Sequence, residues 1–475
     1  MARKRVFLTG AAGNWGRFVL DEFRTRADRF EVIALVLPTP NDTAAIRQYE
    51  DMSNLQVRFG DLTDYDAVAE CVAGADYVAH LGGIVSPVGD DNPELALRVN
   101  AGSMRNIVRA VQAQPDPSAI GVIGIGTIAQ FGDRNPPHHW GRIGDPMRPA
   151  HFDGYAQSKI VAEKTLVESG LPKWVSLRQT GIFHPGMLEI RDPIMTHSPF
   201  EGVMEWASAD DSARLIANIC EDQMPSEFWC DAYNIGGGEA WRLTNWELQT
   251  RMTAAFGVSD VRKWYERNWF ATRNFHGQWY TDSDDLEKLV PFRGDSFDAA
   301  LTRAVAANPS LKMAGRMPAW VVKNLFMKPL TLKPRGTMAY IRDNDVEKIN
   351  AYFGSRRKWE QIGGWDTFWP PHPDPVPSLL EHGYDETKDS ATWNRADYAD
   401  AADFRGGQLL SEDVTTGAIA TPLTWKCADG HEFEASPRLV LRCGHWCPEC
   451  VRDTAGYARQ SERNQFLAQF ATQSK

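Results

Sequence analysis

The amino-acid sequence predicts an α/β protein whose first half folds into a doubly wound parallel sheet. Short β-branched runs alternate with segments of helical apolar spacing through the first 240 residues. This alternation requires crossover connections, which place helices on both faces of a parallel sheet. A glycine-rich turn also stands between the first run and the first helix. A smaller lobe, a helical extension and a small C-terminal metal-binding module are expected to follow.

The expected elements follow one another in the order that a parallel sheet requires. Seven runs are expected to form strands, namely Arg5–Thr9, Glu31–Leu37, Leu55–Gly60, Ala75–Leu81, Ile120–Gly126, Trp174–Gln179 and Ala232–Ile235. Helical spacing occupies Trp15–Ala27, Asp64–Ala73 and Pro93–Gln114. After about residue 258 the pattern weakens, and the proline-rich stretch Trp369–Pro377 excludes a helix and indicates an extended linker.

Length and composition exclude several classes of protein. With 475 residues, roughly three domains are expected. The 43% hydrophobic and 24% charged content is ordinary for a globular protein, and the net charge of −11 disfavours nucleic acid as the main partner. No apolar run reaches the ~20 residues that span a bilayer. The N-terminal apolar run is too short for a signal peptide, and seven cysteines are no secreted framework. A cytoplasmic location is therefore expected.

The glycine-rich turn has the spacing of a dinucleotide-binding loop. Glycines at these positions allow a tight turn and close approach of the backbone to a pyrophosphate, which the helix N-terminus then binds. The residues expected to contact the cofactor here are Gly10, Gly13, Asn14, Trp15 and Gly16.

The residues after the second and third expected strands are candidates for contacts with the ribose and the adenine of the cofactor. Asp61, followed by Leu62, is either an adenine ligand or the N-cap of the next helix, and the sequence leaves both open. The position that would bind the ribose 2′ substituent lies in Leu37–Pro40, which holds neither carboxylate nor arginine. NAD is preferred because no cation is placed for a 2′-phosphate, and NADP is not excluded.

A tyrosine–lysine pair is the candidate acid/base. Tyr155 and Lys159 are four residues apart, hence on one helix face, where the ammonium would favour the phenolate and lower the phenol pKa. Thr127 ends the fifth strand, at the sheet edge where ligands bind. A second such pair, Tyr384 and Lys388, lies far from any nucleotide loop and is not favoured.

The order of these motifs resembles the extended short-chain dehydrogenase/reductase family, the NAD-dependent epimerase/dehydratase group, over about residues 4–257. Further matching segments are His80–Gly83, Asn100, Leu177–Pro185, Asp210–Arg214 and Tyr233–Gly237. The resemblance implies a Rossmann fold, with Tyr155 as acid/base, Lys159 as its partner and ribose ligand, and Thr127 orienting the substrate oxygen. It also implies that Leu81, Gly82, Gly83, Asn100, Gln179, Thr180, Gly181 and Ile182 contact the cofactor.

Three positions depart from the family pattern. Thr127 replaces a commoner serine and keeps the hydroxyl, Gly82-Gly83 replaces Ala-Ala, and Asn14-Trp15 replaces an aromatic–isoleucine pair. None removes a catalytic group, although Trp15 is expected to alter the nucleotide pocket.

Four residues near the C-terminus have metal-ligand spacing. Cys427 and His431 form one chelating turn and Cys447 and Cys450 another, as in a zinc ribbon or treble-clef knuckle. Four protein ligands leave no position for water, so a structural Zn²⁺ is expected. Cys443 and His445 are spare candidates. Residues 406–475 carry seven Lys/Arg against eight Asp/Glu, which favours a packing or protein-contact module over nucleic-acid binding.

Residues 299–342 contain eight bases and no acid. Within them, Ala319–Lys328 has the pattern of an amphipathic basic helix. Packing on the substrate lobe with solvated lysines is preferred; contact with an anionic membrane surface and a cationic collar for an anionic substrate are the alternatives.

The predicted domains are a dinucleotide-binding Rossmann domain (1–177, its sheet completed by parts of 178–240), a substrate lobe (178–300), an extension of unknown role (301–405) and the zinc module (406–475). We expect a homodimeric, NAD(P)-dependent dehydrogenase acting on a small-molecule secondary alcohol or carbonyl. Few cations and the aromatic residues Trp206, Trp241, Trp264 and Trp269 favour an apolar substrate over a nucleotide diphosphate. The alternatives are a nucleotide-sugar epimerase/dehydratase with tightly bound NAD, and a nucleotide-sensing scaffold.

Overall fold

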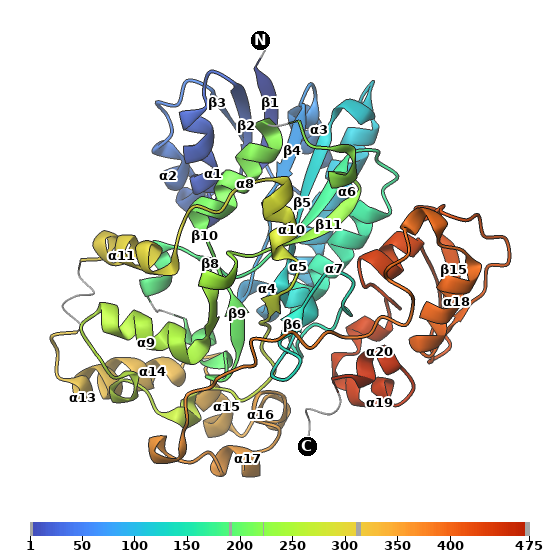
Figure 1. The fold of residues 1–475 in the computed structure, drawn as a ribbon. Helices are drawn as coiled ribbons and strands as arrows, with labels where there is room; N and C mark the ends of the chain where they lie inside the picture. The colour runs from blue at the N-terminus through green and yellow to red at the C-terminus, as the bar shows by residue number, and fades with distance from the viewer. Residues whose placement is uncertain (1–2, 190–191, 222, 310–314, 471–475) are drawn as a thin grey trace.

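The computed structural model describes residues 3–189, 192–221, 223–309 and 315–470, and its centre is a seven-stranded parallel sheet (Figure 1). The strand order is β11-β7-β5-β4-β1-β2-β3. The strands are β1 Lys4–Thr9, β2 Phe30–Val36, β3 Leu55–Phe59, β4 Tyr77–His80, β5 Gly121–Thr127, β7 Trp174–Gln179 and β11 Asp231–Ile235. β4, β5 and β7 are buried along their whole length, as expected for continuous apolar runs covered on both faces.

Helices cover both faces of this sheet, so the predicted doubly wound Rossmann fold is confirmed. Helices α1 and α8 pack together on one face, and α3, α6 and α7 cover the other. The helices of this domain are α1 Asn14–Thr25, α2 Pro40–Arg47, α3 Tyr65–Val72, α4 Val88–Asp91, α5 Pro93–Ala96, α6 Gly102–Gln112, α7 Gly154–Val167 and α8 Ala209–Glu221.

The single helix expected over residues 93–114 contains a π-helical turn, Leu97–Ala101, between α5 and α6. Asn100 lies in this turn, and its side-chain amide is held by the backbone of Ile84, which donates to Oδ1 and accepts from Nδ2, each at 2.8 Å. Single π turns inside helices commonly occur at functional sites, and this one turns Asn100 toward the loop after β4.

A second lobe lies at the carboxyl edge of the sheet and has an aromatic core. Its short strands are β6 Trp140–Gly141, β8 Ile182–Phe183, β9 Val203–Glu205, β10 Ala207–Ser208, β12 Arg242–Thr244 and β13 Trp279–Tyr280. Its helices are α9 Asn245–Ala255, α11 Phe297–Ala307, α13 Ala319–Val321, α14 Lys328–Thr331, α15 Thr337–Asp343, α16 Val346–Phe353 and α17 Arg356–Glu360, with a π turn over Val322–Met327. Helix α10 Ser283–Leu289 instead packs beside β11, and its Leu286 belongs to the core of the sheet domain. Trp241, Trp264 and Trp269 are buried in its core.

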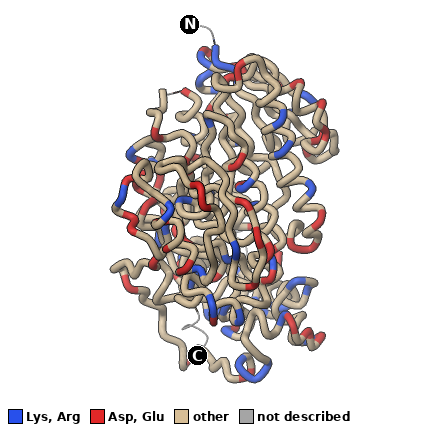
Figure 2. Tube along the Cα trace, turned by 90° about the vertical axis from the view of Figure 1, so that its right-hand side faces the viewer, with Lys and Arg blue, Asp and Glu red and all other residues tan. Residues whose placement is uncertain are grey.

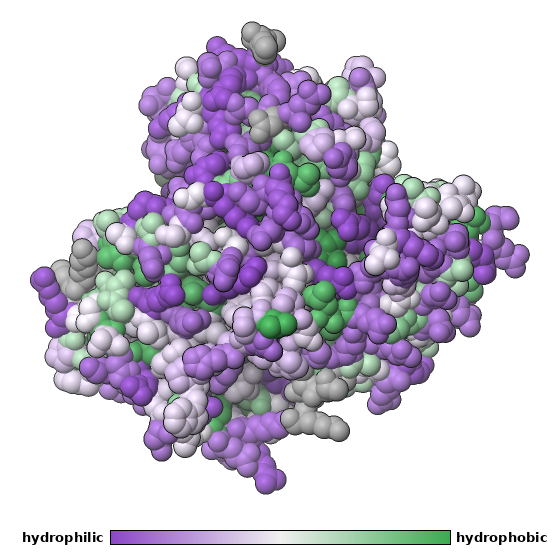
Figure 3. Space-filling view, in the orientation of Figure 1, coloured by the Kyte–Doolittle hydropathy of each residue, from purple (hydrophilic) through white to green (hydrophobic). Residues whose placement is uncertain are grey.

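The described parts of the basic stretch, 299–309 and 315–342, pack on this lobe, as preferred from the sequence. Val322 and Met327 are buried in the lobe core, whereas Trp320, Leu325 and Phe326 are exposed. Figure 3 shows hydrophobic residues scattered among hydrophilic ones over the face that it presents. Several of the bases pair with acids from other segments: Lys323 with Glu266, Arg303 with Asp295, and Arg335 with Asp91 and Asp192. Their charge is therefore largely compensated by the surrounding fold.

A proline-rich linker joins the lobe to the C-terminal module. The stretch Trp369–Pro377 contains no helix or strand, and its Asp374 carbonyl accepts hydrogen bonds from the His139 and Trp140 side chains. In Figure 1 the linker runs across the molecule to the orange and red module. The module contains α18 Arg395–Phe404, the antiparallel strands β14 Gln408–Leu409, β15 Leu423–Lys426 and β16 Glu432–Ala435, and helices α19 Tyr457–Ser461 and α20 Gln465–Ala468.

The module shares one continuous apolar core with the helices on its side of the sheet. Trp425 and Val440 belong to the same buried cluster as Leu166 of α7 and Met104 of α6. Figure 2 shows acidic and basic residues interspersed over the side of the molecule that it presents. Among the described residues, no helix is long and apolar enough to cross a bilayer.

Candidate active site and metal centre

The glycine-rich loop after β1 has the backbone geometry that a dinucleotide requires. Gly10 has a positive φ of 73°, and a Cβ there would lie 2.7 Å from the Gly82 amide nitrogen. A Cβ on Gly16 would collide with the Gly10 carbonyl oxygen. Gly13 is the N-cap of α1 and offers no side-chain acceptor, so the first helical N–H groups stay available to an anion.

The loop after β4 forms the opposite wall of this site. The Gly82 amide donates to Thr9 Oγ1 at 2.8 Å, and a Cβ on Gly82 would lie 2.7 Å from Leu62 Cδ1. A Cβ on Gly83 would lie 2.5 Å from Asn100 Oδ1 and 3.9 Å from Lys159 Nζ. The structure therefore brings Leu62, Gly82, Gly83, Asn100 and Lys159 together, as the resemblance implies.

Asp61 is exposed and does not cap the next helix. Its Oδ1 accepts from the amide and hydroxyl of Thr63, and Asp64 is the N-cap of α3. The N-cap alternative for Asp61 is therefore wrong, because its carboxylate closes the turn over residues 61–63 and the next residue, Asp64, is the N-cap. Asn14 is also exposed and accepts from Arg17.

Gln179 and Trp15, which lie at two points of the expected cofactor site, have buried polar atoms that the described residues leave unpaired. Gln179 ends β7 and is 6% exposed, and neither its Oε1 nor its Nε2 has a hydrogen-bond partner; Nε1 of Trp15 is in the same condition. Buried polar groups are normally satisfied, so these atoms are what a bound cofactor would be expected to pair with.

The residues that follow β7 are held in place by contacts with the lobe. The Thr180 hydroxyl donates to the Glu205 carbonyl, and Ile182 pairs with Ala207 in a short parallel ladder. A Cβ on Gly181 would lie 2.5 Å from Met204 Sδ. The sequence-predicted cofactor residues thus line the carboxyl edge of the sheet from β1 to β7.

His80, to which the sequence assigned no role, connects the two walls of the nucleotide site. Its Nδ1 lies 2.8 Å from Thr9 Oγ1 and its Nε2 lies 3.1 Å from Ser103 Oγ. Complete burial, with Lys159 nearby, lowers the His80 pKa to about 3. The imidazole is therefore neutral and structural.

Thr127, Tyr155 and Lys159 meet where β5 ends against α7. The Lys159 ammonium donates to the Ile125 carbonyl oxygen at 2.9 Å, and burial lowers its pKa to about 8. Burial raises the pKa of Tyr155 to about 12, although a hydrogen bond with Thr127 acts in the opposite direction. The expectation that Lys159 lowers the phenol pKa therefore fails for the protein alone, because desolvation of the phenolate dominates. A protonated phenol is suited to donate a proton.

Two carboxylates and an imidazole surround the start of α7. Asp153 caps the helix by accepting from the Ala156 amide at 2.7 Å, and its Oδ2 lies 3.7 Å from His276 Nδ1. Asp90 Oδ1 accepts from the Tyr155 amide at 3.2 Å. Burial and the nearby Asp153 raise the pKa of Asp90 to about 7. Sequence reasoning missed this cluster, because its members come from three segments without a shared motif.

Replacing Asp90 with asparagine is expected to stabilise the protein in mildly alkaline solution. A carboxyl whose pKa is raised by folding binds its proton more tightly in the folded state, so its contribution to stability is lost as pH rises from about 4 to about 7. Asparagine keeps the acceptor for the Tyr155 amide but does not ionise. Urea unfolding should give a higher free energy of unfolding for Asp90→Asn at about pH 8 and a vanishing difference at about pH 4. An equal increase in the free energy of unfolding at both pH values would show that the ionisation of Asp90 is not the cause.

An apolar cavity of about 150 Å³ lies within the lobe, and Thr127, Tyr155 and Lys159 are not among the described residues that line it. Met204 and Trp206 line it and also contact Gly181, and His276 connects its wall to Asp153. The lining residues are Asn135, Met187, Ile194, Met195, Ser198, Pro199, Gly202, Val203, Met204, Trp206, Leu243, Asn245, Leu248, Gln249, Phe275, His276 and Gly277. Of the four tryptophans expected to form an aromatic cleft, Trp206 alone is among them.

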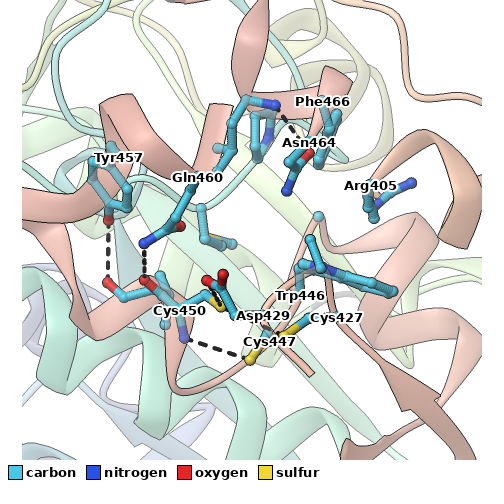
Figure 4. A pocket seen from close by; sticks show the side chains of 16 residues that line it. Arg405, Cys427, Asp429, Trp446, Cys447, Cys450, Tyr457, Gln460, Asn464 and Phe466 are labelled. Atoms are coloured by element: carbon cyan, nitrogen blue, oxygen red, sulfur yellow. Dashed lines mark hydrogen bonds between the residues drawn. The ribbon is translucent and has the colours of Figure 1, made fainter. Parts of the chain in front are cut away.

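The side chains of Cys427, His431, Cys447 and Cys450 converge in the C-terminal module, and all four donor atoms lie within 4.8 Å of one another. Figure 4 shows the cysteine side chains directed toward one another. The Cys427 and Cys450 sulfurs are 3.7 Å apart, and His431 Nδ1 lies 3.4 to 3.5 Å from the three sulfurs. A tetrahedral zinc with bonds of ~2.3 Å to sulfur and ~2.05 Å to nitrogen requires separations of about 3.8 and 3.6 Å. The donor set therefore fits a closed zinc site.

The two spare ligand candidates lie outside this quartet and connect the module to α7. His445 Nε2 lies 2.8 Å from Glu163 Oε1, and the Cys443 carbonyl accepts from Arg178 at 2.7 Å. Arg178 also forms two hydrogen bonds with Glu163, and these three side chains are nearly inaccessible to solvent. Glu163 lies one helical turn after Lys159, so the metal module is joined by buried polar bonds to the helix that carries the acid/base pair.

Comparison with known proteins agrees with this geometry. Residues 10–223 match a family described as NAD(P)H-binding. The chain is 30% identical to human 3β-hydroxysteroid dehydrogenase type 7 over 209 residues, covering 40% of this chain and 54% of that protein. It is 27% identical to 3β-hydroxysteroid dehydrogenase/Δ5→4-isomerase of Mycobacterium tuberculosis over 214 residues, covering 42% and 52%. The chain thus spans about half the length of these curated relatives.

Solved structures share the fold at lower sequence identity. dTDP-glucose 4,6-dehydratase from Bacillus anthracis in complex with NAD aligns at a TM-score of 0.51 and 14% identity, covering 65% of this chain and 98% of the other. A double mutant of DesIV, a dTDP-glucose 4,6-dehydratase from Streptomyces venezuelae, aligns at 0.51 and 21%, covering 65% and 99%. Residues 10–223 of this chain thus match the NAD(P)H-binding family, and the chain shares its fold with NAD-dependent dehydratases of known structure.

Proposed function

We propose that the protein is an NAD(P)-dependent oxidoreductase that interconverts a secondary alcohol and a carbonyl group on an apolar substrate. The observation that carries the proposal is the apolar cavity of the lobe, whose lining residues Met204 and Trp206 contact Gly181 and whose His276 lies 3.7 Å from Asp153, the N-cap of the helix that holds Tyr155 and Lys159. Two curated relatives are named as hydroxysteroid dehydrogenases, which supports an alcohol on an apolar skeleton.

The chain's own residues would position the substrate oxygen and move its proton. The Tyr155 phenol, protonated at neutral pH, donates to the oxygen during carbonyl reduction, and the Thr127 hydroxyl orients that oxygen. The Lys159 ammonium supports the charge that develops on the phenol and binds the nicotinamide ribose. When bound, the nicotinamide cofactor supplies or accepts the hydride. Gly10, Gly13 and Gly16 would hold its pyrophosphate, and Gln179 would pair near its other end.

The epimerase/dehydratase alternative requires cationic residues to bind the diphosphate of a nucleotide sugar. The lining of the apolar cavity contains neither arginine nor lysine among the described residues. The sequence of residues 186–241 offers only Arg191 and Arg214 as cations, and Arg191 lies outside the described residues. Arg214 is already bonded to Asp211 and to the Phe292 carbonyl, each at 2.6 Å. The neighbours that act on nucleotide sugars share the fold at identities too low to support a shared substrate.

A series of methyl ketones of increasing chain length tests the apolar cavity. Each buried methylene contributes about 0.8 kcal/mol, so kcat/KM with NADH is expected to rise about four-fold per methylene until the cavity is filled. The measurement is NADH absorbance at fixed cofactor concentration. A specificity constant that is flat or falls along the series would contradict an apolar substrate site.

We also retain as proposals a homodimer, a structural Zn²⁺ and a preference for NAD. The zinc proposal rests on the donor geometry described above. Contact with a membrane surface is the less favoured use of Ala319–Lys328, because the stretch is anchored in the lobe and Lys323 is paired with Glu266.

A further inference from the structure

A second, polar cleft lies next to the apolar cavity and is lined by basic residues. Its volume is about 670 Å³, and it is formed by the loop after β5, the lobe, α17 and the end of the C-terminal module. A smaller polar hollow between α16 and α19 shares Asp133, Arg148 and Arg273 with it. Asn135 lines both the cleft and the apolar cavity, so the two are adjoining.

Arg148 presents its hydrogen-bond donors to this cleft. Its guanidinium stacks over the rings of Tyr457 and Phe470, with centroid distances of 5.2 and 5.1 Å. Stacking engages the face of a guanidinium and leaves the in-plane N–H groups for a planar or tetrahedral anion. Within the described part of the chain, the Arg148 side chain forms no hydrogen bond or ion pair. The aromatic rings thus hold the cation in place, and the Asp133 carboxylate is the acid of the cleft that attracts it.

Arg273 and Lys358 add two further cations at the same cleft. A Cβ on Gly354 would lie 3.6 Å from both Arg273 Nη1 and Lys358 Nζ, so both cations approach the cleft at Gly354. Arg273 also repels Arg148 electrostatically. Among the residues that the structure describes, the Arg273 guanidinium has no ion-pair partner. Like charges gathered in a cleft are unfavourable unless an anion binds between them.

The acids of the cleft are too few or too engaged to balance these cations. Asp133 accepts from Asn135 Nδ2 at 2.6 Å and from the Asn274 amide at 2.8 Å, and burial raises its pKa. Glu201 lies 3.8 Å from Arg267. The cleft is therefore locally cationic in a chain whose net charge is −11.

We propose that this cleft binds a phosphate or carboxylate group, carried by a ligand whose apolar part occupies the adjoining cavity. Arg148 and Arg273 are the expected bidentate donors, and Lys358 is the third cation. The ligand class is an amphipathic anion. The inference rests on the proposed substrate cavity but not on hydride transfer.

Calorimetry with octyl phosphate, octanoate, octanol and inorganic phosphate tests the proposal on the full chain. NADH is kept at saturation so that the glycine-rich loop is not available to phosphate. Charge-assisted hydrogen bonds are expected to make octyl phosphate or octanoate bind at least about ten-fold more tightly than octanol. Arg273→Gln and Arg148→Gln should each remove most of this advantage and leave octanol binding unchanged. Whichever of the two anions binds more tightly identifies the head group.

Arg357→Gln is the matched control, because Arg357 is an exposed cation on α17 next to Lys358 but does not line the cleft. The Arg357→Gln variant should still bind octyl phosphate or octanoate at least about ten-fold more tightly than octanol. The proposal would be overturned if octanol and the two anions bound equally tightly. It would also be overturned if the anions still bound more tightly than octanol in both Arg273→Gln and Arg148→Gln. Arginine-dependent binding of inorganic phosphate without any octanol binding would overturn the link to the cavity, and with it the proposed substrate site. A chain ending at Phe470 that binds the anions about ten-fold more tightly than the full chain would show that the chain's own last residues are the occupant.

Discussion

Turnover should fall by about 10²- to 10⁴-fold when Tyr155 is replaced by phenylalanine, because this change removes the group that exchanges a proton with the substrate oxygen. The side chain is half-buried, with its Cα and Cβ against Gly89 of α4, and phenylalanine keeps its shape. Binding of NADH should therefore be retained, since the hydroxyl is not needed to hold the pyrophosphate. Steady-state rates and fluorescence titration with NADH measure the two quantities separately.

The second tyrosine–lysine pair provides the control for this experiment. The Tyr384 hydroxyl donates to the Leu441 carbonyl inside the C-terminal region, and Lys388 pairs with Asp397. Tyr384→Phe should lose one hydrogen bond, worth about 1 kcal/mol of stability, and keep its activity. Full activity in Tyr155→Phe, or loss in Tyr384→Phe instead, would refute the assignment.

Removal of the metal should unfold the C-terminal module. Structural zinc sites contribute apparent binding free energies of about 10 to 16 kcal/mol, which become folding free energy when no site exists in the unfolded chain. We expect about one zinc per chain, and Cys447→Ser should lose it and lower the melting temperature. Because His445 of the module bonds Glu163 of α7, activity should fall together with the metal content. Elemental analysis and thermal unfolding, before and after chelation, measure both.

Cys443→Ala is the control for the metal experiment. Its thiol is buried and lies four residues before Cys447, but it is not among the four converging donors. This variant should be less stable, because a buried side chain is truncated, and should still bind about one zinc per chain. Chelator-washed protein without zinc, or native protein whose Cys427 and Cys450 are freely alkylated, would refute the site.

Much of the sheet could be predicted because buried parallel strands are continuous apolar runs. Trp174–Gln179 was predicted with its observed bounds, and the other strands differ by one or two residues at their ends. The metal quartet was equally predictable, since both chelating pairs are local in sequence. The cofactor residues followed from the order of motifs along the chain, and the structure places them at one edge of the sheet.

Features made by segments distant in sequence could not be predicted. Asp90, Asp153 and His276 meet only in the folded chain, and neither their spacing nor their composition marks them. Likewise, the bonds among Glu163, Arg178 and His445 depend on where the module docks. The direction of the Tyr155 pKa shift was misjudged for a related reason: the spacing shows the nearby ammonium but not the depth of burial, which dominates.

Exchange of the cofactor tests the central proposal most directly, because a dehydrogenase must release its cofactor in every turnover whereas an epimerase returns the hydride to the same substrate. Purified protein should bind added NADH reversibly, as followed by fluorescence, and oxidise it only when an apolar carbonyl compound is present. Protein that instead retains stoichiometric, non-exchanging NAD and binds nucleotide diphosphate sugars tightly would contradict the proposal and identify the epimerase/dehydratase alternative.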